Sequence, residues 1–105
     1  MSTWTVEYAE RAEFDLEDIY LYIAETLLSP ETAKKQLRRI MERIEKLDEM
    51  PRRFPCYDKP KWRKVGLRRM NVDNFAVFYL PDESSHTVNI IRILYSGRDI
   101  EEILR

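Results

Sequence analysis

The stretch that decides the fold is residues 66–95, GLRRMNVDNFAVFYLPDESSHTVNIIRILY. It holds three segments rich in β-branched and aromatic residues, which is the composition of β-strands. The segments run from Leu67 to Val72, from Phe75 to Leu80 and from Thr87 to Tyr95. Asp73-Asn74 and the polar residues 81–86 separate them, and both links have turn-forming composition. Because links this short join antiparallel neighbours, we predict an antiparallel meander.

The chain before this stretch shows one strand pattern followed by a helix pattern. Apolar and polar residues alternate from Trp4 to Tyr8, as in a half-buried strand. From Ala9 to near Leu28 the apolar residues recur at steps of three and four, which predicts an amphipathic helix. Its apolar stripe consists of Leu16, Ile19, Tyr20, Ile23 and Leu27.

A second helix is predicted to begin at Ser29. The Ser29 hydroxyl can accept an unpaired backbone N–H, Pro30 fits the first helical position and Glu31 suits the positive end of the dipole. Helical spacing then continues until Pro51 blocks it. The buried stripe is Ala33, Leu37, Ile40, Ile44 and Leu47. Since only about two residues link the two helices, they must form an antiparallel hairpin.

The remaining segments complete an α+β fold of two layers. Residues 51–66 hold three prolines among basic and aromatic residues, so we predict an ordered basic loop rather than a helix or a central strand. Asp99 and Glu102 fit a capping box, which predicts a short C-terminal helix. The N-terminal strand and the helical hairpin then pack on the C-terminal antiparallel sheet, whose edge the first strand joins. We expect residues 1–105 to form a single domain.

The composition excludes several classes of protein. A chain of 105 residues can bury one core, and 44% hydrophobic with 35% charged residues is typical of a folded, soluble domain. No apolar run approaches the roughly 20 residues that span a bilayer, and residues 1–15 lack the apolar segment of a secretory signal. We therefore expect a cytoplasmic protein with no membrane partner. With Cys56 and His86 each alone of its kind, the sequence predicts no metal site and no cofactor.

Charge is unevenly distributed although the net charge is -1. Residues 7–25 hold seven acids against the single base Arg11, whereas residues 51–71 hold eight bases against the single acid Asp58. Part of the surface is therefore basic. Such a surface can bind a phosphate backbone or an acidic protein, and the sequence leaves both open.

Arg92 is the most informative candidate for a functional site. It interrupts an apolar strand, and a desolvated guanidinium must meet a carboxylate or a phosphate. The carboxylate could be Asp15 or Glu17, whereas a phosphate would make Arg92 functional. A metal-free ribonuclease could neutralise phosphate with arginines and move protons with a tyrosine, which adds Tyr95 and Arg98 as candidates. Tyr95 also fits a packing role at the rim of the core.

Short segments in both halves of the chain carry a family resemblance. In the C-terminal half they are Gly66 to Met70, Phe75 to Tyr79, Val88 to Tyr95 and Arg98 to Ile100. In the N-terminal half they are Tyr8-Ala9, Asp15 to Ile19, Tyr22 to Ala24, Ile44 to Leu47, Met50-Pro51 and Phe54-Pro55. Together they resemble the RelE/ParE superfamily of toxins from type II toxin–antitoxin (plasmid stabilisation) systems. The resemblance implies the RelE/ParE toxin fold and a cognate antitoxin whose C-terminal segment wraps the helices and sheet.

The resemblance implies two kinds of target. RelE-like members cut ribosome-bound mRNA and have a strongly basic body with an arginine early in the middle strand of the meander. This chain has Ala76 there and a pI near 5.9, and its strands look closer to ParE-like members, which poison DNA gyrase by binding it. We therefore expect a growth-inhibiting DNA gyrase inhibitor. The alternatives are a ribosome-dependent mRNA endonuclease (an mRNA interferase) and a non-toxic partner-binding module of the same fold.

Each alternative assigns its own residues. For a gyrase inhibitor, the expected target-binding residues are Arg68, Arg69, Lys61, Arg63 and Lys64. Arg68 and Arg69 are adjacent on a strand and point to opposite faces, so at most one belongs to a given surface. For a ribonuclease, the catalytic residues would be Arg92, Tyr95 and Arg98, and only then is the chain an enzyme. The antitoxin is expected to bind Leu16, Ile19, Tyr20 and Ile23.

Overall fold

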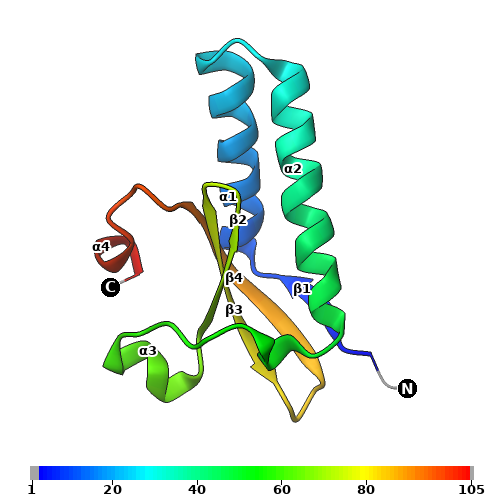
Figure 1. Cartoon of the computed structure of the whole chain (residues 1–105), viewed down its shortest axis with the longest axis vertical. Coiled ribbons are helices and arrows are strands. Elements are labelled where there is room, and N and C mark those ends of the chain that lie inside the picture. The colour runs from blue at the N-terminus through cyan, green and yellow to red at the C-terminus, as the bar shows by residue number, and fades with distance from the viewer. Residues whose placement is uncertain (1–2, 105) are drawn as a thin grey trace.

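The computed structural model describes residues 3–104, which form a four-stranded sheet flanked by helices (Figure 1). The strands are β1 (Thr5–Tyr8), β2 (Arg68–Val72), β3 (Phe75–Asp82) and β4 (Thr87–Tyr95). The helices are α1 (Glu10–Leu21), α2 (Pro30–Glu45), α3 (Pro60–Val65) and α4 (Ile100–Leu104). A π-helical turn (Tyr22–Thr26) extends α1, and two 3-10 turns (Lys46–Asp48 and Pro51–Arg53) follow α2. Within the described range, no helix is both long enough and apolar enough to cross a membrane.

The sheet confirms the predicted meander and its extra edge strand. The strand order is β1-β4-β3-β2, and β2, β3 and β4 pair antiparallel. The helical hairpin carries the chain across the sheet, so β1 pairs parallel with β4, with Thr5 opposite Thr87 and Tyr8 opposite Ile90. The fold is therefore the α+β arrangement that the periodicity predicts.

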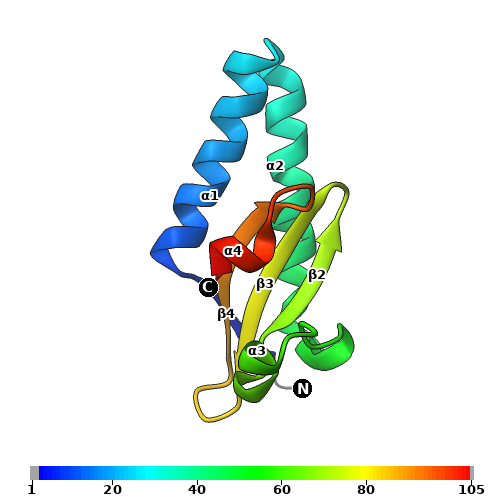
Figure 2. The same cartoon turned by 90° about the vertical axis from the view of Figure 1, so that its left-hand side faces the viewer.

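The two faces of the sheet have separate cores. On one face the helical hairpin packs on buried side chains of the strands, and this larger cluster contains Ile40, Ile44, Met70, Val77, Tyr79 and Ile90. On the other face α3 and α4 lie over a smaller cluster, which contains Leu67, Phe78, Leu94 and Ile100. Figure 2 shows α3 and α4 in front of the sheet and α2 behind it. The short helices thus cover a face that the hairpin leaves open.

A β-bulge in β4 decides where Arg92 points. Phe78 pairs with Arg92 and Tyr79 pairs with Ile90, so Ile91 has no partner of its own in β3. Ile91 packs in the smaller cluster beside Phe78, and Arg92 lies directly across from Phe78. The bulge therefore turns two successive side chains to the same face, which regular alternation forbids.

Three expectations from the sequence are wrong in detail. Residues 51–66 contain the helix α3, because Pro60 stands in its first turn, where no N–H is needed. Gly66 ends α3 in the left-handed region at φ 82°. The Ser29 hydroxyl donates to the Thr32 hydroxyl and caps no backbone N–H. β3 continues through Pro81, which pairs with Val88 of β4 at a position beyond the end of β2, where only one neighbouring strand is present.

The helical end of the hairpin also differs from the expectation. The π-helical turn stops at Thr26, and Leu28 takes a left-handed conformation at φ 53° instead of continuing the helix. At the C-terminus the structure agrees with the capping pattern, because the Asp99 carboxylate accepts the backbone N–H of Glu102 at 3.3 Å.

Tyr79 fastens the segment after α2 to the centre of the sheet. Its hydroxyl donates to the Pro51 carbonyl at 2.6 Å in a fully buried site. Burial raises the pKa of Tyr79 to about 12, because the phenolate would lose its hydration. The folded state therefore keeps the phenol neutral at a pH where the unfolded chain ionises it.

We predict that Tyr79→Phe lowers the free energy of unfolding by about 1–2 kcal/mol at neutral pH, because the Pro51 carbonyl loses its donor. The raised pKa adds a pH dependence: its stabilising contribution is complete below about pH 10 and is lost between pH 10 and about 12. Urea unfolding followed by circular dichroism should show that the free energy of unfolding falls less across this pH window in the variant than in the wild type. Equal losses would contradict the assignment, and the exposed Tyr22→Phe is the matched control.

Candidate partner-binding groove and basic surface

A buried ion pair joins α1 to β4. The guanidinium of Arg92 donates from Nε to Oδ2 of Asp15 at 2.8 Å and from Nη2 to Oδ1 at 3.1 Å. Both side chains are largely removed from solvent, with 13% of Arg92 and 9% of Asp15 exposed. Of the two carboxylates considered from the sequence, Asp15 is the one that pairs with Arg92.

The same carboxylate also completes the hydrogen bonding of β4. β1 pairs with β4 only as far as Ile90, and beyond that point the backbone N–H of Ile93 donates to Oδ2 of Asp15 at 2.9 Å. Asp15 thus accepts three hydrogen bonds. One of them satisfies a backbone N–H on the edge of β4 beyond the point where the pairing with β1 ends. A buried carboxylate in this position needs all three donors to offset its lost hydration.

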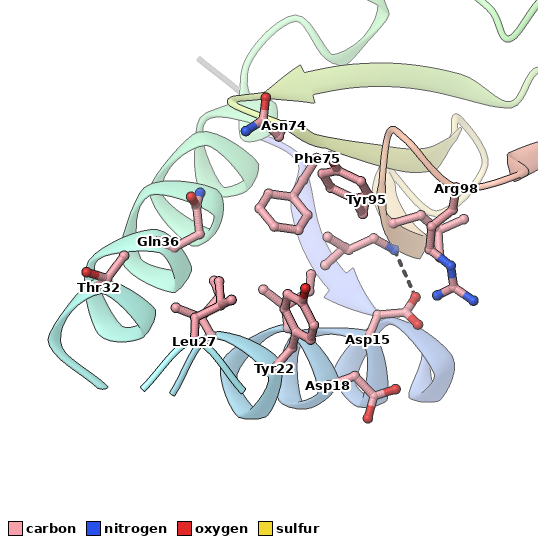
Figure 3. A pocket seen from close by; sticks show the side chains of 14 residues that line it. Asp15, Asp18, Tyr22, Leu27, Thr32, Gln36, Asn74, Phe75, Tyr95 and Arg98 are labelled. Atoms are coloured by element: carbon pink, nitrogen blue, oxygen red, sulfur yellow. Dashed lines mark hydrogen bonds between the residues drawn. The ribbon is translucent and has the colours of Figure 1, made fainter. Parts of the chain in front are cut away.

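A groove lies where the helical hairpin rises away from the sheet, and Figure 3 shows the side chains around it. Its volume is about 780 Å³. Most of its lining is apolar or aromatic, with polar groups at the rim. The lining residues are Asp15, Asp18, Ile19, Tyr22, Ile23, Leu27, Thr32, Gln36, Asn74, Phe75, Ile93, Leu94, Tyr95 and Arg98. We call this feature the hairpin groove.

One wall of the hairpin groove is held in place by the turn between β2 and β3. Arg39 on α2 donates two hydrogen bonds of 2.8 Å to the carboxylate of Asp73, and Gln36 donates a third at 3.0 Å. The bonds from Arg39 and then Gln36 lower the pKa of Asp73 below its usual range. On the other side of the turn, Ser96 donates from its N–H and its hydroxyl to the Asn74 carbonyl. The turn therefore links α2 to the end of β4.

Tyr95 and Arg98 stand at the mouth of this groove (Figure 3). The Tyr95 ring is half exposed and packs edge to face on Phe75, with the ring centroids 6.0 Å apart. Gly97 also lies close to the ring, because an added Cβ there would approach Tyr95 Cε2 to 2.4 Å. The glycine thus leaves the space that the tyrosine ring occupies.

The five basic residues predicted to bind a target lie on and after α3, and we call them the basic surface: Lys61, Arg63, Lys64, Arg68 and Arg69. Their side chains are not equally free. Arg63 pairs with Asp58, and the Arg68 guanidinium donates to the carbonyls of Phe54 and Arg52 at 2.6 and 3.0 Å. Arg69 lies over the Phe78 ring and donates to Asn71 at 2.9 Å. Arg68 therefore secures the loop, whereas the others face outward or along the sheet.

Comparison with known families places the chain. Residues 6–100 match the family model of the ParE toxin of the type II toxin–antitoxin system, parDE. The chain belongs to the ParE toxin family. No curated protein sequence matches it significantly.

Solved structures give the same fold for this ParE-family chain. It is similar to a chain of the chromosomal ParDE system from P. aeruginosa, with a TM-score of 0.73 and 21% identity, covering 89% of this chain and 96% of that one. It is also similar to a chain of the RelBE2 toxin–antitoxin complex from Mycobacterium tuberculosis, with a TM-score of 0.64 and 19% identity, covering 89% and 98%. A third similar structure is a chain of the intact RelBE toxin–antitoxin complex from E. coli. Its TM-score is 0.60 and its identity is 12%, and the match covers 90% of this chain and 99% of that one.

In this ParE-family chain the three candidate catalytic residues have different surroundings. Tyr95 and Arg98 share the hairpin groove, but the guanidinium of Arg92 is bound to Asp15. The structural interpretation of Arg92 is therefore confirmed by its ion pair. Catalytic roles for the trio remain predictions.

The residues predicted to bind an antitoxin lie in three different places. Ile19 and Ile23 line the hairpin groove, and Leu16 is buried in the larger core. Tyr20 points elsewhere, into a shallow depression between α1 and α2. The sequence missed Tyr22 and Phe75 as groove residues, because Tyr22 stands outside the apolar stripe and Phe75 is distant along the chain. Tyr22 follows Asp15, Asp18 and Ile19 at helical steps of three and four, so it shares the face of α1 that lines the groove.

We predict that Asp15→Ala destabilises the fold by about 3–5 kcal/mol, because it leaves the Arg92 guanidinium buried without its carboxylate. Asp15→Asn should destabilise the fold less than Asp15→Ala, since the amide oxygen of asparagine can still accept the Ile93 N–H. Urea unfolding of Asp15→Ala, Arg92→Ala and the double variant measures the coupling. The double variant should lose clearly less free energy of unfolding than the two single variants lose in sum. Additive losses would show that Asp15 and Arg92 are not coupled.

Proposed function

We propose that this ParE-family chain is the toxin of a type II toxin–antitoxin pair and that it arrests growth in the cytosol by binding DNA gyrase. The observation that carries the proposal is the Arg92–Asp15 ion pair. A metal-free ribonuclease that relied on Arg92, Tyr95 and Arg98 would need the Arg92 guanidinium to face a phosphate. Instead, two of its donor groups are directed at a carboxylate that also holds the β4 backbone. This arrangement favours a protein that acts by binding.

The proposed contact with gyrase is the basic surface. Lys61, Arg63 and Lys64 are exposed on α3, and Arg69 follows on β2 on the same face as Phe78. Arg68 serves this surface indirectly, because its bonds to the Phe54 and Arg52 carbonyls fix the loop that leads to α3. Arg69 is therefore the cleaner residue to change.

We further propose that a segment of the cognate antitoxin occupies the hairpin groove. Ile19, Ile23 and Leu27 from the hairpin face Phe75 from the sheet, so an apolar side chain entering there would be covered from both layers. Asp18 stands at the same groove and would favour a basic residue in the antitoxin. The named ParDE and RelBE structures are toxin–antitoxin systems, which supports a partner of this kind.

The gyrase proposal predicts that Arg69→Glu relieves inhibition. The purified chain should inhibit supercoiling by gyrase, and Arg69→Glu should raise the concentration needed for half inhibition about tenfold, because a rim cation becomes repulsive. Lys35→Glu is the matched control, since Lys35 is exposed on α2, away from the basic surface. In cells, amino-acid incorporation should continue in the first minutes after induction while growth stops.

Two results would contradict this function. An immediate collapse of amino-acid incorporation would favour the mRNA endonuclease, and undisturbed growth with active gyrase would favour the non-toxic module. Equal inhibition by the wild type and Arg69→Glu would remove Arg69 from the contact.

The antitoxin proposal predicts that Leu27→Glu weakens the complex by about tenfold to a hundredfold, because an exposed leucine that the antitoxin would cover is replaced by a carboxylate. Leu28→Glu is the matched control, since Leu28 is 82% exposed and does not line the groove. Affinity is measured by isothermal titration with the protein encoded by the open reading frame beside this gene. Equal weakening by both variants would place the antitoxin elsewhere.

A further inference from the structure

The cations of the basic surface differ in whether a carboxylate already neutralises them. Arg63 is paired with Asp58, and Lys59, just before α3, is 3.5 Å from Glu101 on α4. Within residues 3–104, by contrast, no acid pairs with Lys61 or Lys64. The Lys61 ammonium lies over the Trp62 ring at 4.9 Å from the ring centroid. Two lysines on one short helix therefore keep their charge available.

α3 presents these two lysines on a fixed support. Trp62 packs into the smaller core beside Tyr57 and Ile103, so the opposite side of the helix faces outward. Lys61 and Lys64 are three residues apart and share that outer side, where both are exposed. Pro60 and Gly66 fix the two ends of the helix, and the Lys59–Glu101 pair ties its beginning to α4. The two charges are thus held together, and among the described residues no carboxylate neutralises either of them.

Within the basic surface, Arg69 suits the contact with the gyrase protein, whereas the two unpaired lysines suit the phosphate backbone of the DNA that gyrase holds. Lysine is depleted at the centre of protein interfaces, where arginine and aromatic residues are preferred. As a compact charge on a flexible stem, its ammonium contacts phosphate oxygens without needing a fixed bidentate geometry. The acids of α1 are carried on the hairpin, and Figure 1 places α3 at the other end of the molecule from the hairpin tip. A polyanion can therefore approach α3 from the end of the molecule that lies opposite the hairpin tip.

We propose that the outer side of α3, through Lys61 and Lys64, binds the phosphate backbone of duplex DNA. This inference deepens the proposed function, because gyrase acts while holding DNA, and a toxin that touches both would bind the enzyme–DNA complex more tightly than free enzyme. Two phosphate contacts give weak binding that depends on salt. Each contact contributes a slope of about −0.9 to the logarithm of the binding constant against the logarithm of the salt concentration.

The test measures binding to a short fluorescein-labelled DNA duplex by fluorescence anisotropy over a series of NaCl concentrations, with no gyrase present. For Lys61→Gln/Lys64→Gln, the slope should become less steep by about 1.8, since two phosphate contacts are lost. Lys34→Gln/Lys35→Gln removes the same charge from the exposed side of α2 and should leave the slope unchanged. Thermal unfolding of each variant confirms that it folds.

Several outcomes would overturn the inference. These are no salt-dependent binding by the wild type, an equal loss in the two double variants, or clearly tighter binding of single-stranded RNA than of duplex DNA. Supercoiling assays with the same proteins keep this inference separate from the proposed function. Inhibition of gyrase without DNA binding would reject the inference alone, whereas DNA binding without inhibition would reject the gyrase proposal alone.

Discussion

The carboxylate of Asp15 is the point on which the two layers of this protein depend. It receives two hydrogen bonds from the Arg92 guanidinium and one from the Ile93 backbone, so one side chain of α1 satisfies both a buried charge and an open strand edge. The bulge at Ile91 lies next to this contact, since Arg92 pairs with Phe78 and Ile90 with Tyr79. The contact joins α1 to β4 beside the hairpin groove, which Asp15 also lines.

Most of the fold could be predicted from the sequence because hydrophobic periodicity reports which face of an element is buried. The meander, the hairpin and the edge position of β1 all follow from such patterns. The periodicity failed where local backbone chemistry decides. Proline discouraged a helix at residues 51–66, yet Pro60 is compatible with the first turn of α3, and Ser29 found the Thr32 hydroxyl as a partner instead of capping α2. Neither outcome leaves a periodic signal.

The candidate site could be predicted only in part. The need of Arg92 for an anion was visible in the sequence, but the choice of Asp15 over Glu17 depends on the rotation of α1 against β4, which no local pattern records. The hairpin groove combines Phe75 with residues of α1 that are distant along the chain. Arg68 could be recognised as basic, but its bonds to loop carbonyls could not, because they depend on how the loop folds back.

The parallel pairing of β1 with β4 has a consequence for the order of events during translation. β1 leaves the ribosome first, but its partner in the sheet, residues 87–90, is made more than three quarters of the chain later. Until then the hairpin lacks the strand that joins β1 to the rest of the sheet, and non-local pairing of this kind slows folding. A nascent chain interrupted before Arg92 would also lack both groups that Asp15 holds. Completion of the fold is thereby coupled to completion of synthesis.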